Sequence, residues 1–339
     1  MSEPVLSVRD LRVAFRTEDA TVRAVRGLTF DLAPGEILGI VGESGSGKSA
    51  AAMALTALNR SANATLEGEV LLNGRNLLQL GERRLRPIRG AEIAMIFQDP
   101  MTSLTPVHRV GALIAEVLRA HGPLSRAQAR ERAIALLGDV GIPDPAARVD
   151  DYPHEFSGGM RQRVMIAMAL ACRPAVLIAD EPTTALDVTI QAQILRLIRR
   201  LRADLQTAVL LITHDLGVVA QVADRVAVMY AGRFVEEGPT AEVFDAPRHP
   251  YTLGLLASVP RTDRPRSKLL RAIDGQPPPM TSGDDGCAFR PRCHAAHEAC
   301  RVRPELLDRG GGPSHRDACW LTDDTLRSQE AVPDGAPRA

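Results

Sequence analysis

The sequence lacks a net charge, because 41 Lys and Arg residues balance 41 Asp and Glu residues in 339. A protein that binds nucleic acid mainly through the phosphates needs an excess of basic residues. The balance of charge therefore argues against DNA or RNA as the primary ligand. Lysine itself is scarce and occurs only as Lys48 and Lys268. We attribute this scarcity to the base composition of the genome and infer no function from it.

Long apolar runs are missing as well. No uncharged apolar stretch is long enough to cross a bilayer, and the start, Met1 to Pro4, lacks the basic region and apolar run of an export signal. We therefore expect a protein that is neither exported nor membrane-spanning. Its length exceeds that of one typical domain, which favours a main domain with an appendage.

A glycine-rich loop, Gly42 to Ser49, follows the apolar run Glu36 to Val41, which is typical of a buried central strand. Glycines allow backbone N–H groups to turn inward around phosphate oxygens, while Lys48 adds a cation and Ser49 a metal ligand. The loop therefore predicts a nucleotide site, in which the cradle residues are Gly42, Ser44, Gly45 and Gly47.

A second phosphate-binding pattern, Phe156 to Gln162, opens an apolar helix predicted over Ser157 to Cys172. Ser157, Gly158 and Gly159 offer a hydroxyl, bare amides and the positive end of that helix to an anion. The chain thus has two anion-binding helix ends but one P-loop lysine, which predicts that the site needs a partner domain.

Four polar side chains follow predicted strands. Asp180 ends an apolar strand, where its carboxylate could reach a Mg²⁺ held beside Ser49, and Glu181 is the candidate to polarise an attacking water. His214 could approach the γ-phosphate from a neighbouring strand, and the amide of Gln98 could bind both metal and water. Each residue by itself also fits a merely structural role.

Strand and helix patterns alternate as in a parallel α/β sheet. We expect hairpin turns at Asn73-Gly74 and Ala231-Gly232 and a capped helix from Ser125 to Val140. The other expected strands are Leu6–Phe15, Gly27–Leu32, Ile93–Phe97, Ala175–Ala179 and Ala208–Ile212, and the other expected helices are Lys48–Leu58, Val107–Ala120 and Val188–Leu205.

These motifs, in this order, resemble the Walker A, Q-loop, signature, Walker B, D-loop and H-loop set of ABC-type ATPases over about Leu6 to Gly238. The matching residues are Gly42–Ser49, Gln98, Phe156–Gln162, Ala179–Glu181, Ala185–Asp187 and His214. The resemblance implies a P-loop NTPase with a RecA-like α/β core, an antiparallel β subdomain and an inserted helical subdomain at about 98–172. It also implies ATP and Mg²⁺ as cofactors, with ATP held between the P-loop of one subunit and the signature serine of another.

Further details of the nucleotide site follow from the same resemblance. Asp187 is implied to lie at the bound nucleotide, and Phe15 resembles the aromatic that stacks on adenine, although a core Phe would fit equally. Phe156 and Met160 replace the usual Leu and Gln of the signature. Neither change removes the Ser157 hydroxyl or a phosphate-binding amide, so we expect a hydrolytically competent site.

Within this family, the sequence resembles the ATPase subunits of dipeptide and oligopeptide importers in five segments. These are Gln98–Leu104, Asp180–Gln193, His249–Thr252, Gln276–Pro278 and Cys287 to Cys319. The resemblance implies two permeases, a second ATPase subunit, an extracytoplasmic peptide-binding protein and a place on the cytoplasmic face of the inner membrane. A nickel, glutathione or other small-solute system remains open, as does a soluble ABC ATPase acting on DNA or ribosomes. The expected divisions are an ATPase domain over 1–250, a C-terminal extension over 251–322, with a linker through Arg261–Pro279, and a disordered tail over 323–339.

The C-terminal extension contains Cys287, Cys293, Cys300 and Cys319, separated by five, six and eighteen residues. Reducing conditions disfavour disulfides, so four clustered thiols predict a metal. Zinc, an iron–sulfur cluster and unligated thiols stay open, because the usual Cys-x-x-Cys knuckle of zinc sites is absent. The resemblance to importer subunits with a [4Fe–4S] cluster favours the cluster. Cys172 is expected to be a buried apolar residue.

Overall fold

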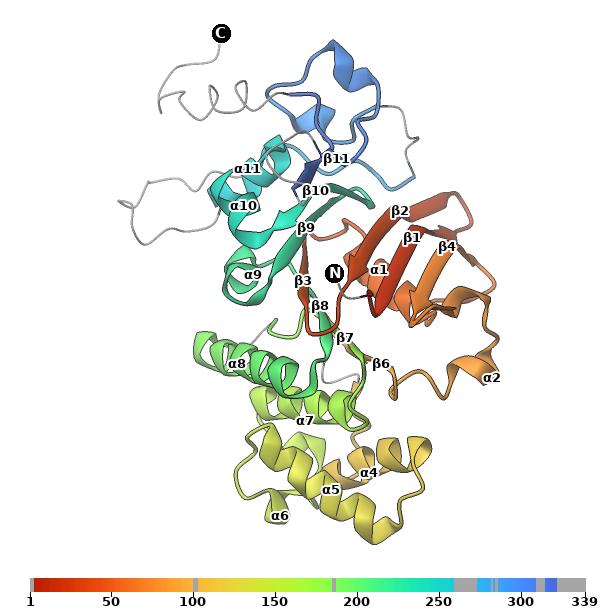
Figure 1. Ribbon diagram of the computed structural model, residues 1–339, viewed down its shortest axis with the longest axis vertical. Helices are drawn as coiled ribbons and strands as arrows, with labels where there is room; N and C mark the ends of the chain where they lie inside the picture. Colours follow the sequence, from red (N-terminus) through yellow and green to blue (C-terminus); the bar gives the residue numbers. More distant parts are fainter. Residues whose placement is uncertain are drawn as a thin grey trace.

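The computed structural model describes residues 3–99, 103–184, 187–258, 273–281, 283, 286–308 and 315–321. The molecule is elongated, with a helical block (α4 to α7) at one end and the C-terminal segment (the described residues between 273 and 321) at the other. Two sheets lie between them (Figure 1). No helix in these ranges combines the length and the apolar character needed to cross a membrane.

The core sheet has eight strands in the order β11-β12-β10-β9-β3-β8-β7-β6. Its five strands from β9 to β6 run parallel, while β10, β12 and β11 are antiparallel additions. The strands β3, β7 and β8 are buried at every residue, as their continuous apolar runs predict. The bounds are β3 Ile37–Val41, β6 Ile93–Ile96, β7 Val176–Asp180, β8 Ala208–Thr213, β9 Arg225–Tyr230, β10 Arg233–Pro239, β11 Leu307–Asp308 and β12 Arg316–Asp317.

A second, antiparallel sheet has the order β2-β1-β4-β5 and lies beside the first (Figure 1). Its strands are β1 Leu6–Arg16, β2 Thr21–Leu32, β4 Ala64–Leu72 and β5 Arg75–Asn76. The predicted Asn73-Gly74 turn is confirmed, with φ angles of 47° and 76° that suit a two-residue hairpin. Strand β2 begins at Thr21 rather than at Gly27, because it pairs with β1 along its whole length.

The helices follow the predicted pattern with shifted ends. Helix α1 stops at Leu55 instead of Leu58, because Ala57 adopts a left-handed φ of 52°. The Ser125 cap is confirmed as a capping box with Gln128. The bounds are α1 Lys48–Leu55, α2 Glu82–Leu85, α4 Val110–His121, α5 Arg126–Asp139, α6 Pro145–Arg148, α7 Gly158–Leu170, α8 Val188–Leu205, α9 Leu216–Val222, α10 Thr240–Asp245 and α11 Pro250–Ser258.

Helix α7 connects the helical block to the sheet. It packs on α4 and α5 on one side and on β6 on the other. Seven of its residues are buried, and six of these, among them Val164 and Ile166, belong to the same apolar cluster as α4 and β7. The start of α7 is therefore fixed relative to the sheet through a continuous core.

The C-terminal segment shares a core with the rest of the chain. Strand β12 pairs with β10, and Phe289 is buried beside Tyr230 of β9 and Tyr251 of α11. The predicted linker falls partly, and the predicted disordered tail over 323–339 wholly, outside the described residues. Within those residues the segment contributes strands to the main sheet.

Candidate functional site

The P-loop lies between β3 and α1 and approaches two neighbouring strands closely. A Cβ at Gly42 would lie 2.2 Å from the carbonyl oxygen of Met229, and one at Gly47 would lie 2.1 Å from that of Ala24. Gly47 also has a φ of 103°, which side chains rarely tolerate. Gly45 has a φ of 79° but faces open space. Glycine at positions 42 and 47 is thus required by β9 and β2.

Lys48 is buried within the loop, with 6% of its surface exposed. Its ammonium donates to the carbonyl oxygens of Gly42 and Glu43, at 2.7 and 3.0 Å, and lies 3.4 Å from the hydroxyl of Ser46. Burial lowers the pKa of Lys48, although the charges of Glu181 and Asp180 oppose that effect. The Lys48 cation is therefore held inside the loop by backbone oxygens.

Ser49 and Asp180 come together as the sequence predicts for two ligands of one cation. The Ser49 hydroxyl donates to Asp180 Oδ1 at 3.2 Å, and Asp180 is 4% exposed. Burial raises the pKa of Asp180, and the hydrogen bond from Ser49 partly counters this effect. Gln98, the third predicted ligand, instead turns its amide nitrogen to Glu181 Oε2 at 3.0 Å.

Glu181 is fixed on three sides at the end of β7. Its N–H donates to the carbonyl oxygen of Ile212 at 2.8 Å, the Thr184 hydroxyl donates to Oε2 at 2.8 Å, and His214 Nδ1 lies 3.2 Å from Oε1. Its φ of 49° is unusual for a residue with a side chain and indicates a position imposed by its surroundings. Burial by itself would raise the pKa of Glu181, but the contacts with Thr184 and His214 lower it.

Thr184 was not among the predicted site residues. Its position three residues after Glu181, in the run Asp180-Glu181-Pro182-Thr183-Thr184, was the available signal. A threonine in a turn has many structural uses, so the sequence could not show that its hydroxyl binds the carboxylate.

The start of α7, the second predicted anion-binding helix end, is open to solvent. Ser157 is exposed and caps α7, since its hydroxyl accepts from the N–H of Met160 at 3.3 Å. Among the described residues, nothing outside the neighbouring backbone of its own helix lies within 4 Å of the position a Cβ would take at Gly158. A Cβ at Gly159 would lie 2.7 Å from Ile190 of α8, the helix that Asp187 caps. The structure thus joins the signature to the start of α8.

The two helix ends belong to different parts of the fold. Helix α1 packs against β1, β2, β7 and β8, whereas α7 packs against β6, α4 and α5. Of the other predicted nucleotide contacts, Phe15 is partly buried against the core under the antiparallel sheet, which leaves both of its interpretations open. Ala185 and Leu186 of the predicted D-loop lie outside the described residues.

Two C-terminal residues reach the P-loop, and sequence reasoning missed both. The Arg292 guanidinium binds the Glu43 carboxylate, and the Tyr251 hydroxyl accepts from the Glu43 N–H. They lie more than 200 positions from Glu43 in sequence, with separations of 249 and 208. No local pattern could have revealed such a contact.

The four C-terminal cysteines gather around one small cavity of about 10 Å³, which Trp320 also lines. Burial raises the pKa of Cys287 and Cys293, and raises that of Cys319 to about 12. Among the described residues no group of three or more His, Cys, Asp or Glu side chains is arranged to hold a metal. The predicted set is thus brought to one place without forming a ligand shell.

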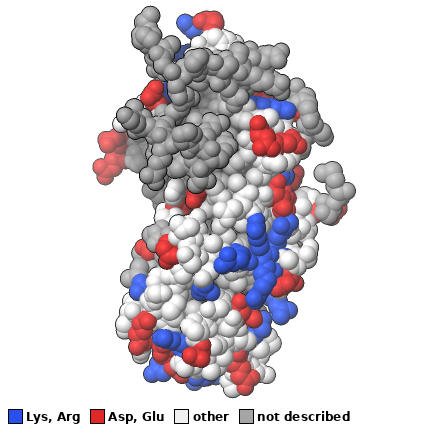
Figure 2. Space-filling model, turned by 90° about the vertical axis from the view of Figure 1, so that its left-hand side faces the viewer, with Lys and Arg blue, Asp and Glu red and all other residues white. Residues whose placement is uncertain are grey.

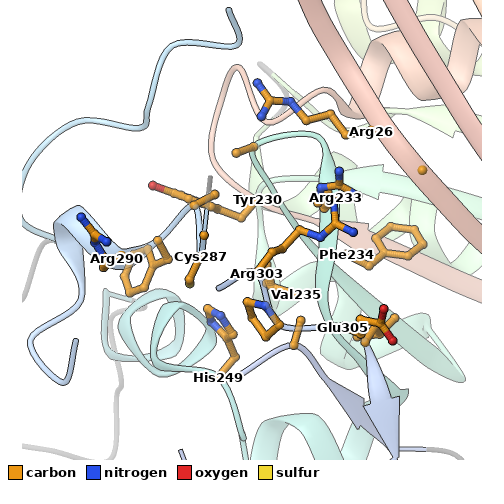
Figure 3. A pocket seen from close by; sticks show the side chains of 18 of the residues that line it. Arg26, Tyr230, Arg233, Phe234, Val235, His249, Cys287, Arg290, Arg303 and Glu305 are labelled. Atoms are coloured by element: carbon orange, nitrogen blue, oxygen red, sulfur yellow. The ribbon is translucent and has the colours of Figure 1, made fainter. Parts of the chain in front are cut away.

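A larger cavity of about 460 Å³ lies between β2, β10 and the C-terminal segment (Figure 3). The residues that line it include Arg26, Arg233, Arg290, Arg303 and Tyr230. No residue of Gly42 to Ser49 lines this cavity, so it is separate from the predicted nucleotide site.

Comparison with known proteins gives matches over most of the chain. The family described as "ABC transporter" matches residues 25–184, and that described as "Oligopeptide/dipeptide transporter, C-terminal region" matches residues 235–300. The chain is 53% identical to "Probable peptide ABC transporter ATP-binding protein y4tR" of Sinorhizobium fredii, over 95% of this chain and 96% of that protein. It is 51% identical to "Dipeptide transport ATP-binding protein DppD" of Bacillus subtilis, over 98% of each.

A solved structure resembles the fold as well. The "Dimeric Structure of MJ0796, a Bacterial ABC Transporter Cassette" superposes with a TM-score of 0.63 at 27% sequence identity. The match covers 69% of this chain and 98% of that one. The predicted ABC ATPase fold is thereby confirmed.

Proposed function

Because this chain belongs to the ABC transporter family, among the ATP-binding subunits of peptide transporters, we propose that it binds and hydrolyses ATP to energise the import of di- or oligopeptides. The observation that carries the proposal is the position of Glu181, ionised and fixed beside the Ser49–Asp180 pair and the P-loop. Similarity through the C-terminal region supports peptides as the substrate class.

The residues of the site divide the work of phosphoryl transfer. Lys48 neutralises charge on the phosphates, and the loop amides hold their oxygens. Glu181 orients and polarises the attacking water, while His214 and Thr184 keep its carboxylate in place. Gln98, which follows β6, donates to the same carboxylate from the strand that pairs with β7.

A Mg²⁺ ion fits the oxygen donors of this site. Ser49, Asp180 and the amide oxygen of Gln98 would hold it, and hydroxyl, carboxylate and amide oxygens are the ligands that this cation prefers. The bound ion would neutralise charge on the β- and γ-phosphate oxygens.

The signature residues Ser157, Gly158 and Gly159 serve the ATP of a second ATPase subunit. This assignment is supported by the exposure of Ser157 and Gly158 and by the different packing of α7 and α1. ATP then favours the closed pair because it binds that pair better than the open one, and hydrolysis reopens it. Asp187, at the start of the adjoining α8, lies at the same interface.

Two permeases and an extracytoplasmic peptide-binding protein complete the transporter, and this subunit works on the cytoplasmic face of the inner membrane. The peptide itself does not contact the chain, so a related small solute is the second candidate cargo.

A role on DNA or ribosomes is disfavoured by the zero net charge. Where the face in Figure 2 is coloured, acidic and basic side chains are mixed, except for one cluster of basic side chains.

We divide the chain into an ATPase domain over 1–250, with its helical subdomain at about 98–172, and an extension over 251–322. The block of α4, α5 and α6 on α7 supports the helical subdomain. The pairing of β12 with β10 supports an extension that folds onto the ATPase domain.

We also propose that Cys287, Cys293, Cys300 and Cys319 hold one metal centre, a [4Fe–4S] cluster or a zinc ion. Support comes from their position around one cavity. A cavity of about 10 Å³ has no room for a cluster, so the four thiols would have to move apart around the cavity to bind one. Metal binding would also deprotonate Cys287, Cys293 and Cys319 despite their raised pKa values.

Metal analysis after anaerobic purification tests this centre. About four irons with matching sulfide supports the cluster, zinc supports the alternative, and no metal in repeated preparations refutes the proposal. Cys172→Ser is the matched control, since Cys172 lies on the turn after α7 and outside the cavity.

The function is tested by reconstituting the subunit with co-purified membrane partners in vesicles. We expect ATP hydrolysis that rises when a binding protein loaded with peptide is supplied, and none with Lys48→Ala. Stimulation by another solute alone would contradict peptide import, and co-purification with ribosomes or DNA in place of permeases would contradict the transporter.

A further inference from the structure

We propose that Arg292 is a positioning residue for nucleotide binding, through which the C-terminal segment holds the P-loop in its phosphate-binding form. Arg292 lies in the cysteine-bearing segment and contacts Glu43, the second residue of the loop. The inference rests on the proposed function in so far as the nucleotide binds at this loop.

The contact between the two side chains is bidentate and enclosed. Arg292 Nη1 lies 2.6 Å from Glu43 Oε2, and Nη2 lies 3.0 Å from Oε1. The Arg292 side chain is 4% exposed, against 29% for that of Glu43. An ion pair with both oxygens bound and little water around it fixes geometry far better than a solvated pair.

Other partners keep the guanidinium from moving. Its Nε donates to the carbonyl oxygen of Asp274 at 2.9 Å, and Nη2 also donates to that of Ile273 at 3.2 Å. It lies over the rings of Tyr230 and Phe289, 5.9 Å from each centroid. Arg292 therefore fixes Glu43 relative to β9 and to the C-terminal segment.

The backbone of Glu43 is held by the same part of the chain. Its N–H donates to the Tyr251 hydroxyl at 2.9 Å, and Tyr251 is fully buried at the start of α11. Its carbonyl oxygen accepts from Lys48 and from the N–H of Ser46. Glu43 is thus the residue at which C-terminal contacts meet the contacts inside the loop.

This arrangement predicts that loss of the Arg292 contact lowers the affinity of the subunit for nucleotide, in addition to any loss of folding stability. A loop that is already shaped for phosphate loses little conformational freedom on binding, whereas a released loop must be ordered by the ligand. Arg292 and Tyr251 hold Glu43 from outside, on the side chain and the N–H. Neither of them contacts the Lys48 ammonium that would meet the phosphates.

The test compares the affinity of the full-length subunit for a fluorescent ATP analogue with its melting temperature. We expect Arg292→Gln to weaken binding on the order of tenfold, a typical size for coupling between two sites. Arg292→Lys keeps the charge but cannot bridge both oxygens in the same way, so it should recover only part of the affinity. Tyr251→Phe, which removes one hydroxyl, should weaken binding by a smaller factor and serves if Arg292→Gln fails to fold.

The matched control is Arg301→Gln, in the same segment. Arg301 pairs with Glu298, but both side chains are largely exposed. We expect its affinity to equal that of the unchanged chain. Wild-type affinity in folded Arg292→Gln and Tyr251→Phe, with only a lower melting temperature, would overturn the inference. Failure of the unchanged chain to bind the analogue would instead overturn the proposed function.

Discussion

The starts of α1 and α7 are both glycine-containing helix ends suited to anions, yet they lie in opposite surroundings. At α1, Ser46 and Lys48 are buried, and the backbones of β2 and β9 press on Gly47 and Gly42. At α7, Ser157 and Gly158 are exposed, and no other part of the described chain packs against the position a Cβ would take at Gly158. The first end is part of an enclosed cradle, and the second is a surface.

The difference shows which side of the proposed nucleotide site, the P-loop side or the signature side, a single chain can supply with all its groups. A phosphate at α1 would find Lys48, the proposed metal ligands Ser49 and Asp180, and Glu181 within one chain. An anion at α7 would find a hydroxyl and amides, but the Ser157 hydroxyl is used as the helix cap. Substitutions in the P-loop at the start of α1 should therefore already change nucleotide binding by the isolated subunit, while those at the start of α7 should act only in the assembled complex.

The largest effect is expected from Glu181→Gln, on the enclosed side. The amide cannot polarise water, so turnover of the reconstituted complex should fall about 10²–10⁴-fold, while nucleotide affinity stays unchanged because Lys48 and the loop remain. Steady-state hydrolysis and equilibrium binding measure the two quantities. Turnover close to that of the unchanged complex would move the water-orienting role elsewhere, with His214 the first alternative.

Ser157→Arg tests the exposed side. Its bulk and charge should prevent closure of the dimer and reduce turnover of the complex more than tenfold, a loss of more than about 1.4 kcal/mol in transition-state stabilisation. The isolated subunit should bind nucleotide as before. Ser125→Arg is the control, since Ser125 caps α5 in the same manner outside the signature. Weaker binding by the isolated Ser157→Arg subunit would show that α7 acts within its own chain.

The pair Gly47→Ala and Gly158→Ala sharpens the comparison through stability. At Gly47 the new Cβ meets a carbonyl oxygen at 2.1 Å with φ at 103°, so the free energy of unfolding should fall by about 1–3 kcal/mol. At Gly158 the methyl group enters open space, and the change should be about 0.5 kcal/mol or less. Denaturant unfolding of both variants measures the difference, and equal losses would contradict it.

The smallest effect on nucleotide affinity is expected from Cys319→Ser. Cys319 is buried at the cysteine cavity, away from Glu43, so the change should make the C-terminal segment easier to cleave by protease while affinity for ATP changes less than about threefold. Limited proteolysis and analogue binding measure the two outcomes. A large loss of affinity without increased cleavage would place Cys319 in the nucleotide site.

Much of the fold could be predicted because its signals are local. The Asn73-Gly74 turn needs two residues with positive φ, and the Ser125 box needs a hydroxyl and a glutamine at a fixed spacing. The buried strands β3, β7 and β8 are recognisable from apolar runs alone. The ends of β2 and α1 were predicted less well, because pairing with β1 extends the strand and the backbone of Ala57 stops the helix.

By itself, the sequence determined the nucleotide chemistry, because a P-loop, a strand-end Asp180-Glu181 pair and a helix that begins with Ser157 are each written in a few consecutive residues. Only the tertiary structure decided how these parts are held. The bond from Thr184 to Glu181, the addition of β12 to the core sheet and the contact of Arg292 with Glu43 each depend on where distant backbone segments come to lie. Residue type and spacing specify which groups are available, whereas burial and long-range packing determine which of them meet.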